Sequence, residues 1–94
     1  MDNHDIDPDE YEQLVRANEA TKEEEWCRRN RLNRRDYRKL QIQFDKTPDP
    51  SEASASAEHM IAMHLLNQLG HRTNSRGEAW KLMQRLLACG PLED

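Results

Sequence analysis

A block of arginines between Trp26 and Lys39 is the part of the sequence best suited to binding chemistry. It reads Trp-Cys-Arg-Arg-Asn-Arg-Leu-Asn-Arg-Arg-Asp-Tyr-Arg-Lys. A guanidinium group is a planar fork of donors that pairs in two-pronged fashion with phosphate oxygens and carboxylates. The block therefore predicts a site for an anionic surface on a partner.

On a helix, these bases gather on one side and the aromatic residues on the other. At about 100° per residue, the basic strip consists of Arg28, Arg31, Arg35, Arg38 and Lys39. The opposite face holds Trp26, Tyr37, Leu40 and Phe44. Arginine and aromatic side chains are the commonest anchors of protein interfaces. The residues predicted to bind a partner are Trp26, Arg28, Arg31, Arg35, Tyr37, Arg38 and Lys39.

Charge is segregated along the chain, and the total of −4 hides this. Residues 1–25 contain ten acidic and two basic side chains, a net charge of −8. Residues 26–46 contain eight basic and two acidic side chains, a net charge of +6, and residues 47–94 carry −2. A dedicated nucleic-acid-binding domain is usually basic overall. This pattern favours an acidic protein partner over RNA or DNA.

Three further interpretations of the same charges stay open. The arginine strip can lie along an RNA or DNA phosphate backbone, with affinity from counterion release. The acidic segment 2–25 can act as a nucleic-acid mimic that occupies a basic groove on a partner. Finally, the charges can simply face solvent and pair along the helix, as Glu24 and Arg28 can at i,i+4, for a few tenths of a kcal/mol.

The remaining reactive side chains form no recognisable catalytic or metal site. His59 and His64 are five residues apart, not the four of a helical metal-binding pair. Cys27 has no histidine nearby in the sequence to act as its base. We therefore expect no enzyme activity, metal or cofactor. Both cysteines are expected to be reduced thiols in a cytoplasmic protein, with a Cys27–Cys89 bridge as the alternative.

The elements that position the arginine block are all expected to be helices. β-branched residues are scarce, and Ala, Leu, Glu, Arg, Gln and Met, which are good helix formers, dominate. The predicted fold class is all-α, with a long N-terminal helix followed by an antiparallel αα-hairpin. The long helix covers 9–44, because no Gly or Pro occurs there. It is either continuous or broken near Arg29 to Asn33.

Boundary signals define the rest of the chain. Residues 1–8 form a flexible acidic N-terminus, 45–49 a linker, 50–89 the hairpin and 90–94 a tail. The first hairpin helix should begin at Asp49-Pro50 and end before Gly70; the second should begin at Ser75 and end before Gly90. The apolar stripe of the first is Ala53, Ala57, Met60, Ile61, His64, Leu65 and Leu69. The stripe of the second is Ala79, Leu82, Met83, Leu86 and Leu87.

These features predict a non-enzymatic protein-binding module, such as an inhibitor, adaptor or assembly factor. No motif of a known family stands in the sequence. By size and composition alone, the chain is similar to the small accessory proteins of phages and bacteria that bind a larger machine. A second copy of the chain is a further expected partner. With no run of about 18 apolar residues, no membrane span is expected.

Overall fold

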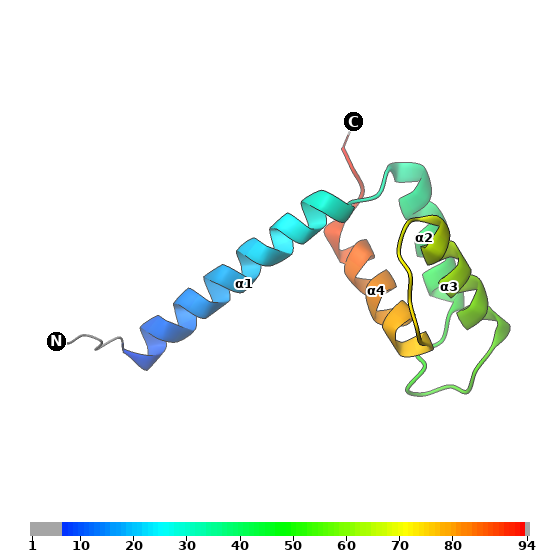
Figure 1. Cartoon of the computed structure of the whole chain (residues 1–94), viewed down its shortest axis with the longest axis horizontal. Coiled ribbons are helices and arrows are strands. Elements are labelled where there is room, and N and C mark those ends of the chain that lie inside the picture. Colours follow the sequence, from blue (N-terminus) through cyan, green and yellow to red (C-terminus); the bar gives the residue numbers. More distant parts are fainter. Residues whose placement is uncertain (1–6, 94) are drawn as a thin grey trace. The chain divides into compact units, whose positions relative to one another are not determined.

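The computed structural model describes residues 7–93, and its regular structure is helical, as predicted. Figure 1 shows four helices, namely α1 (Pro8–Asn30), α2 (Arg34–Lys46), α3 (Ala57–Gln68) and α4 (Arg76–Cys89). No strand occurs within residues 7–93. The chain divides into two units, Met1–Asn30 and Arg31–Asp94, which are described separately. Residues 1–6 and 94, part of the predicted N-terminal segment and tail, lie outside the described residues.

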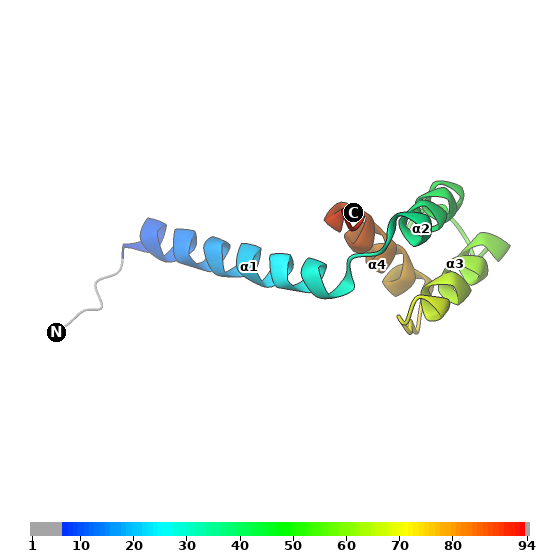
Figure 2. The same ribbon diagram turned by 90° about the horizontal axis from the view of Figure 1, so that it is seen from above.

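Helix α1 is the regular element of the first unit, and Figure 2 shows it as one uninterrupted helix. Asp7 caps it, because its carboxylate accepts a hydrogen bond from the Asp9 N–H at 3.3 Å. Pro8 occupies the first helical position, where a missing N–H costs nothing. Arg28 and Arg29 lie in the last turn, where basic side chains suit the helix dipole. Every side chain from 7 to 25 is exposed.

The helix predicted over 9–44 is broken at residues 31–33. Of the two predicted alternatives, the broken helix is therefore the one observed. Asn33 is the N-cap of α2. Its side-chain oxygen accepts the Asp36 N–H at 2.8 Å, and its amide donates to the Asp36 carboxylate at 3.2 Å. The Leu32 carbonyl accepts a hydrogen bond from the Leu92 N–H at 2.8 Å. A local cap and a contact with the C-terminal tail therefore define the break.

The second unit is built from α2, α3 and α4, and each of these helices contacts the other two. Their shared core consists of Leu40, Ala62, Leu66, Ala79, Met83 and Leu86. The inner faces of α2 and α4 are those predicted, since Leu40 is buried and Ala79, Met83 and Leu86 lie on the predicted stripe. Ser75 caps α4 by accepting the Glu78 N–H at 3.1 Å, and the helix ends at Gly90 with a φ of 78°.

Helix α3 begins seven residues later than predicted, at Ala57 instead of Pro50. Asp49 forms a tight turn instead of a cap, because its carboxylate accepts both the N–H and the hydroxyl of Ser51. Serine hydroxyls compete with the helical backbone, so the three serines within 51–57 make a weak first turn. Ser56 and His59 form a reciprocal capping box and set the actual start.

The buried side of α3 also differs from the predicted stripe. His59, Ala62 and Leu66 face the core, whereas Met60, Ile61 and His64 are exposed. Apolar residues surround most of this helix, so their periodicity does not select one face. Instead, the small Ala62 allows close approach, and His59 finds two backbone partners. Its Nδ1 accepts the Ser56 N–H at 3.2 Å, which leaves Nε2–H to donate to the Pro48 carbonyl at 2.8 Å.

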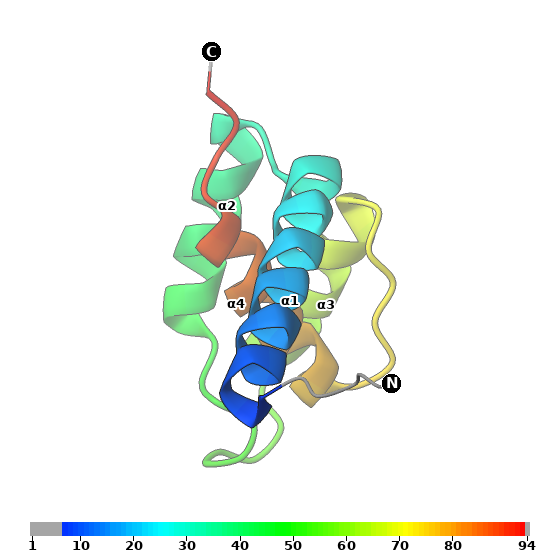
Figure 3. The same ribbon diagram turned by 90° about the vertical axis from the view of Figure 1, so that its left-hand side faces the viewer.

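The connection 69–75 determines how α3 and α4 are oriented. Gly70 ends α3 in the left-handed conformation, with a φ of 93°, as predicted. The connection was expected to make α3 and α4 antiparallel neighbours. In Figures 1 and 3 it runs back beside the helices, so that α2 is the antiparallel neighbour of α3. Only residues 71–73 of this connection have no turn or bend, between a turn at 69–70 and a bend at 74–75.

A buried polar network joins the end of α2 to the start of α3. Helix α2 runs to Lys46, through the first part of the predicted linker. The Thr47 hydroxyl donates to the Gln43 carbonyl at 2.7 Å. The Gln43 side-chain amide donates to the Glu58 carboxylate at 2.8 Å. The network fixes α2 and α3 against each other.

Candidate docking face on α2 and α3

The break after Asn30 divides the predicted arginine strip. Trp26 and Arg28 belong to α1, Arg31 lies in the connection, and the other members lie on α2. The prediction that these bases share one helical face is therefore wrong, because no single helix carries them. On α1, Trp26 is half-buried and Arg28 is exposed.

Two of the predicted site residues serve the fold of the second unit. The Arg31 Nε donates to the Cys89 carbonyl at 3.1 Å. The Tyr37 hydroxyl donates to the Leu87 carbonyl at 2.9 Å. Both carbonyls lie in the last turn of α4, where the i→i+4 donors of the helix run out, and the Leu87 carbonyl also accepts the Gly90 N–H at 3.2 Å. Arg31 and Tyr37 thus cap α4, and both are half-buried.

The structure does bring Arg35, Arg38 and Lys39 together on the outer side of α2. All three are exposed. Within residues 7–93 their side chains form no ion pair and no hydrogen bond. Ile42 follows one turn further along and is 47% exposed. Since the opposite side of α2 packs into the core, this outer side is exposed.

The outer side of α2 continues into a groove shared with α3. The groove has a volume of about 310 Å³ and is lined by Lys39, Ile42, Gln43, Ile61, His64, Leu65 and Gln68. Ile61 is 49% exposed, although the apolar stripe predicted it to be core. We name the combined surface the basic–apolar face. It consists of Arg35, Arg38, Lys39, Ile42, Ile61, His64 and Leu65.

The sequence patterns did not predict the apolar half of this face as an exposed surface. Ile42 follows Leu40 by two residues, or about 200° around a helix, so a buried Leu40 implies an outward Ile42. That signal was available. The exposure of Ile61 could not be found in the same way, because α3 has apolar residues on most sides.

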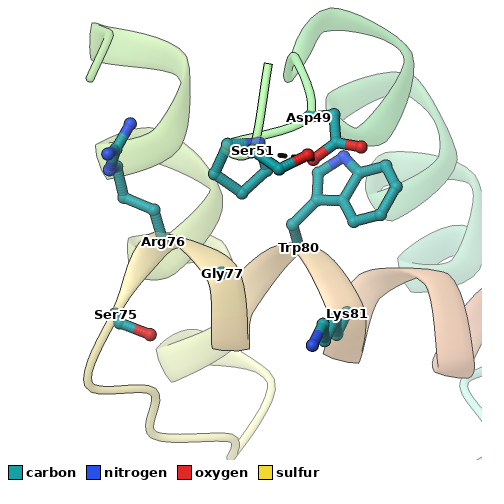
Figure 4. A pocket seen from close by; sticks show the side chains of 8 residues that line it. Asp49, Ser51, Ser75, Arg76, Gly77, Trp80 and Lys81 are labelled. Atoms are coloured by element: carbon teal, nitrogen blue, oxygen red, sulfur yellow. Dashed lines mark hydrogen bonds between the residues drawn. The ribbon is translucent and has the colours of Figure 1, made fainter. Parts of the chain in front are cut away.

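A second cavity, of about 500 Å³, lies at the N-terminal end of α4. Figure 4 shows the Trp80 ring beside Asp49 and Ser51. Trp80 also packs against Phe44, with ring centroids 5.3 Å apart. Hydrogen bonds from the Ser51 N–H and hydroxyl lower the pKa of Asp49, so its carboxylate stays ionised. This negative charge opposes the anion that a helix N-terminus would otherwise attract.

The cysteines differ from the expectation. Both Cys27 and Cys89 are disulfide-bonded, and neither is a free thiol. The prediction of reduced thiols is therefore wrong. The expected cytoplasmic location rested partly on those thiols, and it loses that support.

The helices within residues 7–93 lack the combination of length and apolar character needed to cross a bilayer. No family model, curated protein or solved structure matches the chain.

Proposed function

We propose that this chain is a non-enzymatic protein-binding module whose partner docks on the basic–apolar face. The observation that carries the proposal is the pairing of two exposed isoleucines, Ile42 and Ile61, with three exposed bases on one side of α2 and α3. Exposed isoleucine side chains are stabilised when a partner covers them. A groove between two helices commonly binds an amphipathic helix of a partner. The bases favour an acidic partner and fix its register.

Nucleic acid ranks second for a structural reason. The predicted strip would have offered about five phosphate contacts, but Arg28 belongs to the other unit and Arg31 caps α4. Three bases remain together on the face. Phosphate binding through three contacts should weaken about a hundredfold between about 50 and about 300 mM salt. The apolar groove would contribute nothing to that binding mode.

The proposal is tested by comparing substitutions at matched positions. Ile61→Ser removes apolar area inside the groove, and Met60→Ser removes it from the neighbouring position of α3, which is 66% exposed and lies outside the groove. Each variant, tagged, is used to enrich protein and nucleic acid from the cells that produce the chain. Circular dichroism confirms that each is folded.

We expect a defined protein to be enriched with the wild type and with Met60→Ser, and lost with Ile61→Ser and with Arg38→Glu. Enrichment of nucleic acid that depends on Arg38 but not on Ile61 would instead support nucleic-acid binding through phosphate contacts. Equal loss with Met60→Ser would contradict the proposal, because the groove would then have no special role.

A further inference from the structure

Helix α1 has the composition of a ligand for the basic–apolar face. Its apolar side chains Tyr11, Leu14 and Val15 are 60%, 57% and 36% exposed and lie at i, i+3 and i+4. That spacing puts them on one side of the helix. Nothing in the described residues covers them, and a helix without packing is marginally stable in water.

Acidic side chains flank this apolar stripe. At about 100° per residue, Glu10 lies on one side of the stripe and Glu19 on the other, each within about 100° of its centre. Residues 7–25 contain eight acidic and two basic side chains, a net charge of −6. Arg16, one of the two bases, lies on the far side, 3.8 Å from the Glu12 carboxylate, whereas Lys22 lies in line with the stripe about one turn beyond Glu19. The stripe is thus apolar with an acidic border.

The basic–apolar face is the complement of that stripe in charge and in length. Helix α2 carries five basic and two acidic side chains, a net charge of +3. Arg35 to Ile42 spans about 10 Å along α2, and Glu10 to Glu19 spans about 13 Å along α1, so the two surfaces agree within one helical turn. Opposite charges of this kind steer association and fix register.

We infer that the occupant of the basic–apolar face is α1 of a second copy of this chain. Tyr11, Leu14 and Val15 of one copy lie in the groove beside Ile42 and Ile61 of the other. Glu10 and Glu19 meet Arg35, Arg38 and Lys39. Two copies that exchange α1 reciprocally cover both surfaces and form a closed dimer. This inference rests on the proposed function, because it names the partner of the same face.

A pair of charge-reversed variants tests the inference. In the first, Glu10→Lys and Glu19→Lys make the border of the stripe basic. In the second, Arg35→Glu and Arg38→Glu make the face acidic. All four positions are exposed, so the fold of each unit should be unaffected. Matched controls are Glu24→Lys, on the side of α1 away from the stripe, and Arg72→Glu, which lies off the face.

Sedimentation velocity gives the mass of each protein over a range of concentrations. We expect the wild type and both controls to dimerise reversibly. Each reversed variant alone should dimerise at least about tenfold more weakly, because like charges then meet at the interface. An equimolar mixture of the two reversed variants should recover the dimer, because both interfaces then pair opposite charges.

Three results would overturn the inference: a monomeric wild type at every concentration, a dimer insensitive to the reversals, or a mixture that stays monomeric. None of them would remove the proposed function, because a foreign protein that is lost with Ile61→Ser would still identify the face as a docking site. If the chain neither enriches a partner protein through Ile61 nor forms the dimer, both proposals are contradicted.

Discussion

The side-chain amide of Gln43 on α2 donates a hydrogen bond to the Glu58 carboxylate on α3, at 2.8 Å. The same amide reaches the Glu58 carbonyl at 3.3 Å and the Thr47 hydroxyl at 3.2 Å. Gln43 is buried and also lines the groove. Gln43 therefore links the two helices that form the basic–apolar face, beside the core that they share.

Gln43→Glu should destabilise the second unit. The substitution replaces a donor with a carboxylate that faces Glu58 in a buried setting, at a cost of about 2–3 kcal/mol. Chemical denaturation followed by circular dichroism measures the change. The double variant Gln43→Glu with Glu58→Gln should recover much of the loss, because it exchanges the donor and the acceptor. A double variant no more stable than Gln43→Glu alone would argue against this bond.

Asn33→Ala should lower stability by about 1 kcal/mol, because it removes the cap that starts α2. Asn67→Ala, at an exposed position within α3, is the matched control and should be neutral or slightly stabilising. Comparing the free energy of unfolding of the two variants shows whether Asn33 stabilises the start of α2. Greater stability or helicity for Asn33→Ala would mean that the chain runs as one helix through residues 31–33.

His59→Leu should destabilise the chain by about 2–3 kcal/mol despite its similar size. The Ser56 N–H and the Pro48 carbonyl both lose their partner in a partly buried place. His64→Leu, on the exposed side of the same helix, is the comparison and should change stability little. Equal effects of the two substitutions would contradict the observed orientation of α3.

The free energy of unfolding should fall in mild acid, because protonation of His71 favours the unfolded chain. Burial lowers the pKa of His71 below its ordinary value of 6.5, so the unfolded chain binds a proton more readily than the folded one. The contribution is complete above pH 6.5 and is lost as the pH falls from there towards the lower folded pKa. Unfolding measured across this range should be less pH-dependent for His71→Gln than for the wild type, and an unchanged pH dependence would contradict the burial of His71.

The sequence predicts most of the second unit because several signals there agree. Ser75 with Glu78, Gly70 and Gly90 mark helix ends through local chemistry, which does not depend on the rest of the fold. The inward side of α4 follows from a clear apolar period. The break between α1 and α2 is also encoded locally, in Asn33 and Asp36. The polar middle of residues 9–44 nevertheless fits one continuous helix equally well.

The parts that the sequence does not reveal depend on tertiary context. His59 is buried because the Pro48 carbonyl and the Ser56 N–H reach it, and only the folded chain brings Pro48 there. Arg31 and Tyr37 look like partner anchors in the sequence, yet their targets are carbonyls of α4 more than 45 residues away. With these two bound to the fold and Ile61 turned outward, the candidate site shifts from an arginine strip to a mixed basic and apolar face.

Photo-crosslinking at position 42 tests the proposed docking face most directly. A photoreactive amino acid replaces Ile42 in the full chain, and a second version carries it at Arg72, which is exposed and off the face. After irradiation in the cells that produce the chain, adducts are identified by mass spectrometry. We expect a specific protein adduct at position 42 that is lost with Arg38→Glu and absent at position 72. Only nucleic-acid adducts, or the same adducts at both positions, would contradict the proposed function.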